Sequence, residues 1–450
     1  MFAPERPNSN GFRARVQQSF QSADGSLVLK AYECAAGQGS TDLVRLNRPA
    51  DILLRQHADA TVVTAALLLP LCRDGAIEPD ELRARFGQVI AGLVENVVFE
   101  EKTRSVGAVS PEKRTRSFLQ SISQDVRLVI LHLGLRLAEL EALVTVGSSD
   151  RRAIAQESRD LYVPLADRMG MGQLRSALED VCFRILEPSI YEQLVQGLEP
   201  IQAEDETCLT LLTEGVHHLL ERNSVQGIVH GRTKGLYSLY CKMCRRDRPL
   251  SAIMDRIGLR IIVSTPEQCY TALGLLHTHF QPIPGTFDDY IGLPKQNGYR
   301  SLHTCIYPVP DLSYKPVEIQ IRTEAMHQEA LFGIAAHWRY KIEEEAAQAH
   351  QGQLRWLRGL LAQHAEAVDH AEFIELLQRQ VFSDSLDEGP DWLPTIRGRS
   401  CDFGWPEPTG RYAEDSRTDW LSAREAPALS PPVGTGVSPH GRRPAPHHQG

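Results

Sequence analysis

The chain has 450 residues, of which 42% are hydrophobic and 23% are charged, and its formal net charge is −9. These values exclude a mainly disordered, collagen-like or coiled-coil protein, and the length predicts about three structural units. The acidic balance disfavours a globally basic nucleic-acid binder, although it does not exclude a local basic patch.

The N-terminus, residues 1–25, is polar and carries no apolar segment of the kind found in a secretory signal, and we expect it to be flexible. The most apolar runs, residues 60–72 and 126–144, are too short or too charged to span a bilayer, so no membrane segment is expected. The 9 cysteines are scattered and odd in number, which favours reduced thiols and a cytoplasmic protein.

Residues 26–200 have the pattern of helices almost throughout. Apolar residues recur at spacings of three and four, which is typical of amphipathic helices. One such stripe consists of Leu119, Ile122, Val126, Val129, Ile130, Leu133, Leu137 and Leu140. This part of the chain is therefore predicted to be a helix bundle.

Residues 201–345 alternate between strand-like and helical patterns. Short runs rich in Ile and Val predict strands over residues 256–263, 302–307 and 316–323. Helical spacing predicts helices over residues 268–280 and 324–340. The pattern indicates an α+β fold with a mixed sheet backed by helices.

The run 316–323 alternates strictly between apolar and polar residues. Val317, Ile319 and Ile321 face one side of the predicted strand, whereas Glu318, Gln320 and Arg322 face the other. A polar row of this kind on a central strand suggests a site on one face of the sheet.

A basic segment, residues 231–240 (GRTKGLYSLY), precedes the first of these strands and continues to Lys242. Arg232 and Lys234 at a helix start would place cations beside free N–H groups, which suits a polyphosphate. Lys234, Ser238 and Lys242 would share one helix face. A solvated basic helix face is the alternative.

Two acidic residues lie on or next to neighbouring predicted strands. Asp255 stands at the start of the run 256–263, and Glu318 lies on the polar side of the run 316–323. The two carboxylates could hold Mg²⁺ against phosphates, or one could act as a base. An edge aspartate and a surface glutamate are the alternative.

Residues 287–303 (FDDYIGLPKQNGYRSLH) combine a turn with several ligand-binding residue types. Asn297 and the following glycine predict a turn, and Tyr299 directly after it offers a flat face for a base. Lys295, Asn297 and His303 offer donors for phosphate or purine edges. A turn tyrosine packed on the core is the alternative.

After residue 345 we expect a helical extension over residues 346–385. Residues 386–450 are rich in Pro, Gly and Arg and lack helix or strand periodicity, so disorder is expected there.

Four ordered motifs between residues 205 and 345 resemble the synthetase domain of RelA/SpoT-type (p)ppGpp synthetases: GRTKGLYSLYCKM, DRIGLRIIV, FDDYIGLPKQNGYRSLHT and VEIQIRTEAMHQEALFGIAAHWRYK. The family transfers the β,γ-pyrophosphate of ATP to the 3′-hydroxyl of GTP or GDP. The resemblance implies an all-helical, HD-type N-terminal domain followed by a nucleotidyltransferase-like mixed-sheet synthetase domain.

The resemblance also implies roles for individual residues. The residues that would hold ATP are Arg232, Lys234, Ser238 and Lys242. Asp255 and Glu318 would bind Mg²⁺, and Glu318 would activate the 3′-hydroxyl. Tyr299 would stack on guanine, with Lys295, Asn297 and His303 nearby.

The helical part resembles the family's metal-dependent hydrolase domain, but its metal ligands are missing. Where the family has a His-Asp pair, this chain has Leu69 and Pro70, and Leu135 replaces an acidic ligand. None of these residues can ligate a hard cation. The resemblance therefore implies a pseudo-hydrolase without hydrolase activity, as in RelA-type enzymes. Asp288 and Asp289 point to the same subtype, although Thr286 departs from the usual Glu.

Two further departures from the family concern Leu331, which stands where the family has an acidic residue, and the region beyond residue 382. There the regulatory domains of long members are not recognisable. We expect that the gene is truncated, and a frameshift is one explanation. Ribosome association would then be weakened. A catalytically silent regulator that binds ribosomes or intact synthetases is the alternative function. The preference for GDP or GTP, the response to ribosomes and the oligomeric state stay open.

Overall fold

The computed structural model describes residues 9–37, 43–105, 110–145, 149–246, 250, 253, 256–307, 316–336, 343–367 and 369–382. Within these ranges, no helix combines the length and the apolar character that a membrane crossing requires.

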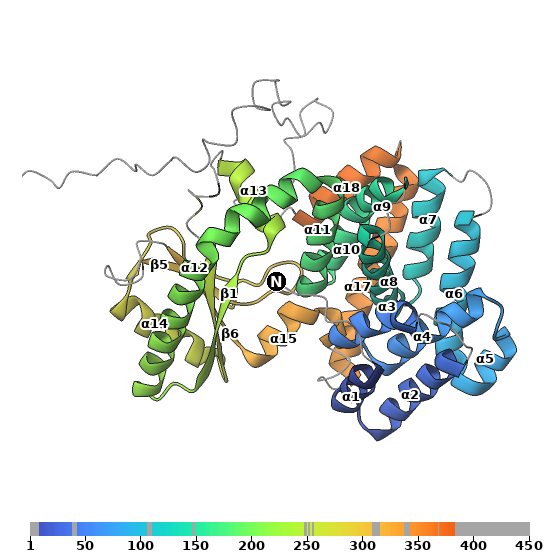
Figure 1. The fold of residues 1–450 in the computed structure, drawn as a ribbon, viewed down its shortest axis with the longest axis horizontal. Coiled ribbons are helices and arrows are strands. Elements are labelled where there is room, and N and C mark those ends of the chain that lie inside the picture. Colours follow the sequence, from blue (N-terminus) through green and yellow to red (C-terminus); the bar gives the residue numbers. More distant parts are fainter. Residues whose placement is uncertain are drawn as a thin grey trace, which may run out of the picture. The chain divides into compact units, whose positions relative to one another are not determined.

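One part of the molecule, which we call the helical half, consists of the helices that share a single apolar core (Figure 1). Its members are α1 (Ser9–Ser19), α2 (Ser22–Gly37), α3 (Leu43–Arg55), α4 (Ala60–Arg73), α5 (Pro79–Phe86), α6 (Gln88–Ser105), α7 (Pro111–Ile122), α8 (Val126–Thr145), α9 (Arg151–Glu157), the π-helical turn η1 (Ser158–Tyr162), α10 (Val163–Arg168), α11 (Gly172–Leu186), α17 (Glu343–Glu366) and α18 (His370–Phe382).

Helix α4 lies at the centre of this core because nearly every side of it is apolar. Residues 62–69 are all buried, so the helix is surrounded by its neighbours rather than facing water. Asp59 caps its first turn, since Oδ1 of Asp59 accepts a hydrogen bond from the amide of Val62 at 2.9 Å. Leu357 of α17 and Phe373 of α18 are buried in the same core, so the predicted helical extension folds onto the bundle.

The second part, which we call the sheet half, consists of six strands and the helices that connect or cover them. Its members are α12 (Pro188–Arg222), β1 (Gly227–Thr233), α13 (Leu236–Arg246), β2 (Ile257–Val263), α14 (Pro266–His279), β3 (Gln281–Pro282), β4 (Asp288–Asp289), β5 (Leu302–Tyr307), β6 (Val317–Thr323) and α15 (Glu324–Phe332).

The strand order is β1-β2-β6-β5-β3, with β4 paired to β5. Strands β2 and β6 are parallel, and the other pairs are antiparallel, so the predicted mixed sheet is confirmed. Strand β6 is central, as the alternation of residues 316–323 predicts. The register places Gly258 beside Glu318 and Arg260 beside Gln320.

The two faces of the sheet differ in chemistry. Helices α12 and α14 cover the apolar face (Figure 1). Leu212 and Leu276 of these helices share one buried apolar core with Leu259 and Ile319 of the sheet. The polar side chains of β6 point to the opposite face. Helix α15 begins where β6 ends, and His327 of α15 lies on the polar side, beside Arg322.

Three predictions about the fold were wrong. Residues 9–25 are not flexible but form α1 and the start of α2, because Phe12 and Val16 are buried in the helical core. The boundary at residues 200–201 falls inside the continuous helix α12. The helix predicted over residues 324–340 is interrupted: α15 ends at Phe332 because Gly333 has a φ of +52°, residues 334–336 are helical again, and residues 337–340 lie outside the described residues. The predicted disordered tail, residues 386–450, lies outside the described residues.

Candidate functional site

Pairing across four strands brings the candidate residues onto the polar face of the sheet. One cross-strand row joins Arg232, Gly258, Glu318 and Cys305, and the next joins His230, Arg260, Gln320 and His303. Because side chains alternate along a strand, both rows point to the same face. Arg232 and Glu318, which are 86 positions apart in sequence, therefore lie in one row.

Glu318 is the carboxylate at the centre of this face. Its Oε2 lies 2.9 Å from Nζ of Lys234, and its Oε1 accepts a hydrogen bond from Nε2 of Gln320 at 3.3 Å. Burial alone would raise the pKa of this carboxyl, but the neighbouring Lys234, His303 and Arg232 outweigh burial and hold the pKa well below its ordinary value. Glu318 is therefore ionised, and its charge is matched by a lysine.

The residues predicted to hold ATP come from a strand, a loop and a helix, which corrects the predicted helix start. Arg232 lies on β1, because β1 pairs with β2 as far as Thr233. Lys234 lies in the loop before α13, and its amide donates to the carbonyl of Arg256 at 3.0 Å. Only Ser238 and Lys242 lie on α13, so the predicted face shared by all three residues does not form.

The predicted partner of Glu318, Asp255, lies outside the described residues. The next residue, Arg256, is described and buried, and its guanidinium is paired with both carboxylate oxygens of Asp205 at 3.0 Å. Strands β2 and β6 are neighbours, as the placement of the two acidic residues required. The proximity of Asp255 to Glu318 stays a prediction.

An aromatic group lies next to Glu318. The hydroxyl of Tyr299 is 2.7 Å from Nε2 of His303, and Nδ1 of His303 is 3.7 Å from Oε1 of Glu318. The ring of Tyr290 meets both Tyr299 and His303 edge to face, and Lys295 lies over the Tyr290 ring at 4.4 Å. Burial lowers the pKa of His303 to about 4, so this imidazole is neutral at pH 7.

The predicted turn before Tyr299 is confirmed. Gly298 has a φ of +82°, a value that favours glycine, and its amide donates to the carbonyl of Lys295 at 2.8 Å. Oδ1 of Asn297 accepts a hydrogen bond from the amide of Tyr299 at 3.1 Å. The Asn297 carbonyl group thus holds the turn itself, which leaves its amide nitrogen as the group that could meet a ligand.

Two arginines on this face were not assigned a role from the sequence. Burial and repulsion from Arg322 and Arg232 lower the pKa of Arg260 to about 9. Arg322 is 2% exposed, lies 5.9 Å from the Tyr299 ring and donates to Nδ1 of His327 at 2.9 Å. The sequence signal for Arg260 is a lone charge within an apolar strand, but only the strand register shows which side chains it meets.

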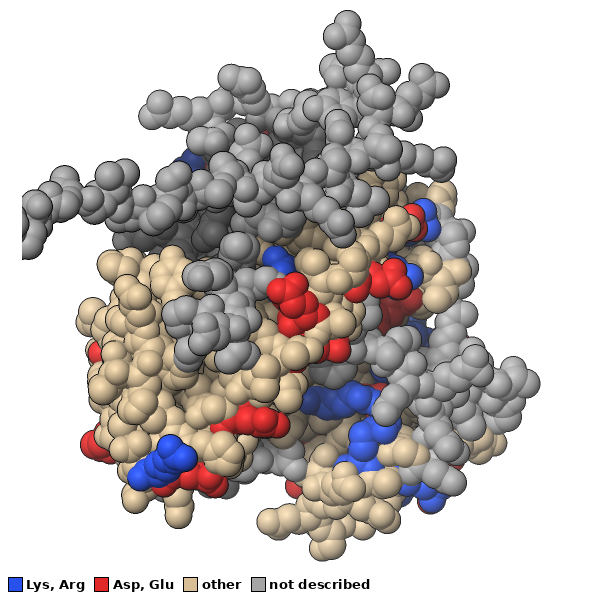
Figure 2. Space-filling view, turned by 60° about the vertical axis from the view of Figure 1, so that its left-hand side comes forward, with Lys and Arg blue, Asp and Glu red and all other residues tan. Residues whose placement is uncertain are grey.

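We call Arg232, Lys234, Arg260, Lys295, His303, Glu318 and Arg322 the sheet-face cluster. Its members influence one another electrostatically, and it holds several cations against one carboxylate. Within the described part of the chain, neither Arg260 nor Arg322 forms an ion pair. On the face drawn in Figure 2, the basic and acidic side chains in view lie in separate groups rather than in one broad basic field. A localised cationic site of this kind suits a polyphosphate more than an extended nucleic acid.

The donors present suit Mg²⁺ in type but not in number. Mg²⁺ prefers oxygen ligands, and the ionised carboxylate of Glu318 is one. In the described ranges, no group of three or more His, Cys, Asp or Glu side chains could hold a metal ion. A magnesium ion here would therefore need phosphate oxygens and a further carboxylate, for which Asp255 is the candidate.

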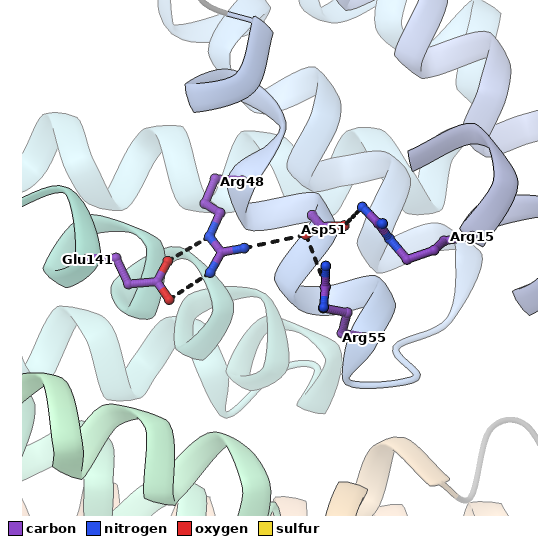
Figure 3. Close-up of polar contacts among 5 residues, drawn as sticks. All are labelled: Arg15, Arg48, Asp51, Arg55 and Glu141. Carbon is purple, nitrogen blue, oxygen red and sulfur yellow. Dashed lines mark hydrogen bonds and ion pairs between the residues drawn. The ribbon is translucent and has the colours of Figure 1, made fainter. Parts of the chain in front are cut away.

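In the helical half, the positions predicted to have lost metal ligands lie on two core helices. Leu69 and Pro70 belong to α4, where Leu69 is fully buried, and Leu135 belongs to α8. The neighbouring helix α3 carries a network of ion pairs (Figure 3).

In that network, Asp51 binds Arg15, Arg48 and Arg55. Arg48 also forms a bidentate ion pair with Glu141, with nitrogen-to-oxygen distances of 2.6 and 2.8 Å (Figure 3). These carboxylates are already neutralised by arginines.

The remaining residues singled out by the family resemblance, Thr286, Asp289 and Leu331, have structural roles. The hydroxyl of Thr286 donates to the carbonyl of Ile283 at 2.7 Å and accepts from the amide of Cys305 at 3.1 Å. Asp289 accepts hydrogen bonds from two amides of the following turn and from the hydroxyl of Tyr270. Leu331 packs against the helical core, where an apolar side chain fits.

Comparison with known proteins assigns both halves. Residues 231–345 match the model of a region found in RelA/SpoT proteins, and residues 27–172 match that of an HD domain. The GTP pyrophosphokinase of Escherichia coli (strain K12) is 35% identical over 349 residues, which cover 75% of this chain and 46% of that protein.

A Synechocystis protein named probable guanosine-3′,5′-bis(diphosphate) 3′-pyrophosphohydrolase is also 35% identical, over 344 residues that cover 75% of this chain and 45% of that protein. Among solved structures, small alarmone synthetase 1 from Bacillus subtilis gives a TM-score of 0.27 at 23% identity, over 37% of this chain and 94% of that one. The chain spans about half the length of the curated relatives it matches.

The two family models fall on the two halves that the fold separates, the HD model on the helical core and the RelA/SpoT model on the sheet. Because relatives with these names align over three quarters of the sequence, the chain belongs to the RelA/SpoT family.

Proposed function

We propose that this protein synthesises (p)ppGpp by transferring the β,γ-pyrophosphate of ATP to the 3′-hydroxyl of GTP or GDP, with Mg²⁺ as cofactor. The observation that carries the proposal is the sheet-face cluster, in which one ionised carboxylate, Glu318, lies among cations and beside Tyr299 and His303. The match to the RelA/SpoT model and the relatives named GTP pyrophosphokinase support the same activity.

In the proposed reaction, the 3′-oxygen of the acceptor forms a bond to the β-phosphorus of ATP. The bond from that phosphorus to the oxygen bridging the α-phosphate breaks, and AMP leaves. The 3′-hydroxyl proton passes to Glu318. Arg232, Lys234 and Arg260 stabilise the negative charge of the ATP phosphates, and positioning of the two nucleotides favours in-line attack. Ser238 and Lys242 contribute from α13.

Lys234 gives Glu318 a way to change its basicity when ATP binds. In this structure, the ion pair at 2.9 Å holds the pKa of Glu318 well below its ordinary value, which makes it a weak base. If Lys234 turns to the ATP phosphates, Glu318 loses its closest cation and its pKa rises. The carboxylate then becomes a better proton acceptor at the moment when ATP is present.

The acceptor site is proposed to lie around Tyr299, whose ring would stack on guanine. Lys295, Asn297 and His303 surround it, and His303 is neutral, so it can both donate and accept hydrogen bonds. Mg²⁺ would be held by Asp255 and Glu318 together with phosphate oxygens, and would supply charge neutralisation.

The proposal is tested by incubating purified protein with radiolabelled ATP, GDP or GTP, and Mg²⁺, and separating the products by chromatography. The wild type should form a guanosine nucleotide with a 3′-pyrophosphate, and Glu318→Gln should lower the rate about 10³-fold. Glu214→Gln, on an exposed position of α12, is the control and should keep the wild-type rate. A wild-type protein that binds both nucleotides without turnover would instead support the silent-regulator alternative.

We further propose that the helical half has no hydrolase activity. Leu69, Pro70 and Leu135 cannot bind a hard cation, and Asp51 is already held by arginines. Incubation with ppGpp and either Mn²⁺ or Mg²⁺ should release no pyrophosphate, and release above the protein-free rate would contradict the proposal. A role in the stringent response and a cytoplasmic location remain predictions.

A further inference from the structure

Three glycines bring the end of α10 and the start of α11 into backbone contact with the sheet half. A Cβ atom on Gly333 would collide with the carbonyl oxygen of Met169, and a Cβ on Gly172 would lie 2.6 Å from the carbonyl oxygen of Ala330. Real Cβ atoms do not approach oxygen so closely. These positions therefore fit glycine, and the two backbones touch directly.

Gly170 extends this contact to the turn that precedes Tyr299. Its φ is +70°, and a Cβ there would lie 3.1 Å from the carbonyl oxygen of Asn297 and 3.3 Å from Cα of Gly333. Beside it, Nη1 of Arg168 donates to Oε1 of Gln296 at 3.2 Å. The segment 168–172 thus lies against two elements of the sheet half, the turn 295–299 and the end of α15.

Both elements lead directly to the sheet-face cluster. Helix α15 follows β6, the strand of Glu318, and its end is fixed because the amide of Ile334 donates to the carbonyl of Met169 at 3.0 Å. Phe332 and Ile334 are buried in the helical core. The turn 295–299 carries Tyr299. Pairing of β5 with β6 fixes the chain from Leu302 onward, and the glycine contact adds a second constraint on the turn that carries Tyr299.

We infer that the glycine contact of Gly170, Gly172 and Gly333 positions the acceptor nucleotide, by fixing the turn 295–299 relative to β6. The inference rests on the proposed function. At Gly170 the contact touches the turn on the acceptor side, whereas Arg232 and Lys234 lie on and after β1, the edge strand on the other side of β2 and β6. Helix α11 reaches the segment after β1 further along its length, at Asp180, whose Oδ1 accepts a hydrogen bond from the amide of Tyr237 at 3.1 Å. A disturbance of the contact therefore weakens acceptor binding and leaves ATP binding unchanged.

Gly170→Ala is the variant that tests this inference. An alanine at a φ of +70° is strained, and its Cβ presses on the carbonyl of Asn297. We expect the KM for GDP or GTP to rise about tenfold, because small displacements of positioning groups have effects of this size or larger. The KM for ATP should stay within about twofold, a change too small to signal lost positioning.

The matched control is Gly75→Ala. Gly75 also has a φ of +70°, but nothing lies within 4 Å of a Cβ built there. The Gly75→Ala substitution therefore causes the same backbone strain without the close contact to a neighbouring carbonyl. Both KM values should equal those of the wild type. Gln296→Ala removes the hydrogen bond from Arg168 without backbone strain, and it should raise the acceptor KM by a smaller factor if Gly170→Ala does not fold.

Hydrogen exchange of the turn separates this inference from the proposed activity. The amides of Gly298 and Tyr299 are bonded to Lys295 and Asn297 within the turn, and both should exchange faster in Gly170→Ala than in Gly75→Ala. Unchanged protection, or an equal rise of both KM values, would overturn the inference. A wild-type chain without turnover would reject the proposed function, and the exchange data would still decide whether the glycines fix the turn.

Discussion

The helical half and the sheet-face cluster differ in whether their arginines are paired with carboxylates. In the helical half, Arg136 is 5% exposed and is paired with Glu139 and Glu157. On the sheet face, Arg322 is 2% exposed and Arg260 lies beside it, and neither forms an ion pair among the described residues. The chain thus pairs a buried cation in one region and, among the described residues, leaves two cations without an ion pair in the other.

The pKa values show what this difference means. Burial alone would lower the pKa of Arg136, but Tyr162, Glu157 and Glu139 outweigh burial, so its pKa lies above the ordinary value. For Arg260, burial and the neighbouring Arg322 and Arg232 outweigh Tyr299 and Glu318, and its pKa falls to about 9. An arginine that is hard to keep charged gains from an incoming anion. Pairing therefore marks cations that hold the fold, and missing pairs mark those available to a ligand.

The largest effect is expected from breaking the most buried carboxylate of the helical half. Asp51 is 1% exposed and binds three arginines. Asp51→Ala leaves these cations facing one another without their shared anion, and should lower the free energy of unfolding by about 3 kcal/mol. Urea unfolding followed by circular dichroism measures this loss.

Asp80→Ala is the control, because Asp80 is 97% exposed in its pair with Arg83. It should change stability little. Equal losses for Asp51→Ala and Asp80→Ala would break the comparison, since burial would then have no influence on what a pair contributes.

The next prediction compares one buried arginine of each region, Arg322 of the sheet face and Arg136 of the helical half. Arg322→Met removes a buried cation without a carboxylate partner, so the unfolding free energy should stay the same or rise, while nucleotide affinity falls about 100-fold. Arg136→Met should do the reverse, with lower stability and unchanged affinity. Equilibrium binding of ATP and GTP together with urea unfolding measures both. A loss of stability in Arg322→Met as large as in Arg136→Met would contradict the proposed division.

The alternation of residues 316–323 sufficed to predict the face that carries Glu318. Alternate side chains of a strand point to opposite faces, so the apolar residues fix which face is buried and the polar ones lie on the other. The turn at Asn297 and Gly298 was also predictable from the local sequence, because glycine readily adopts the positive φ that this turn requires. The position of Arg260 beside Gln320 was not predictable, because it depends on the register of two strands that are far apart in sequence.

The wrong predictions share a cause, which is that long-range contacts override local pattern. The basic segment suggested a helix start at Arg232, but pairing with Gly258 keeps this residue in β1. The polar N-terminus suggested flexibility, but Phe12 and Val16 are buried in the helical core. The close backbone contact at Gly333 ends a helix whose spacing continues past it.

The sheet face should also respond to pH in a defined window. Burial lowers the pKa of His303 to about 4, against an ordinary value of 6.5 in the unfolded chain. Between pH 6.5 and about 4 the unfolded chain therefore binds more protons, so folding stability is complete above this window and declines as the pH falls through it. His303→Gln should make the unfolding free energy less dependent on pH in this range.

Exposed His218 provides the comparison for that measurement, because His218→Gln also removes an imidazole but leaves the sheet face unchanged. Urea titrations at pH 7 and pH 4.5 are sufficient. Identical pH dependence of His303→Gln and the wild type would show that the imidazole is not held neutral by burial.

The smallest effect concerns a pair that looks strong but lies in water. Nε of Arg73 donates to Glu101 at 2.7 Å, and the two side chains are 39% and 36% exposed. Exposed pairs of this kind contribute less than about 1 kcal/mol, because solvent screens the charges and both side chains lose freedom. Arg73→Met should therefore cost far less than Asp51→Ala in the same urea titration. If the two costs are equal, pairing alone would determine the contribution of these charges, and the uncompensated arginines of the sheet face would need an explanation other than a ligand.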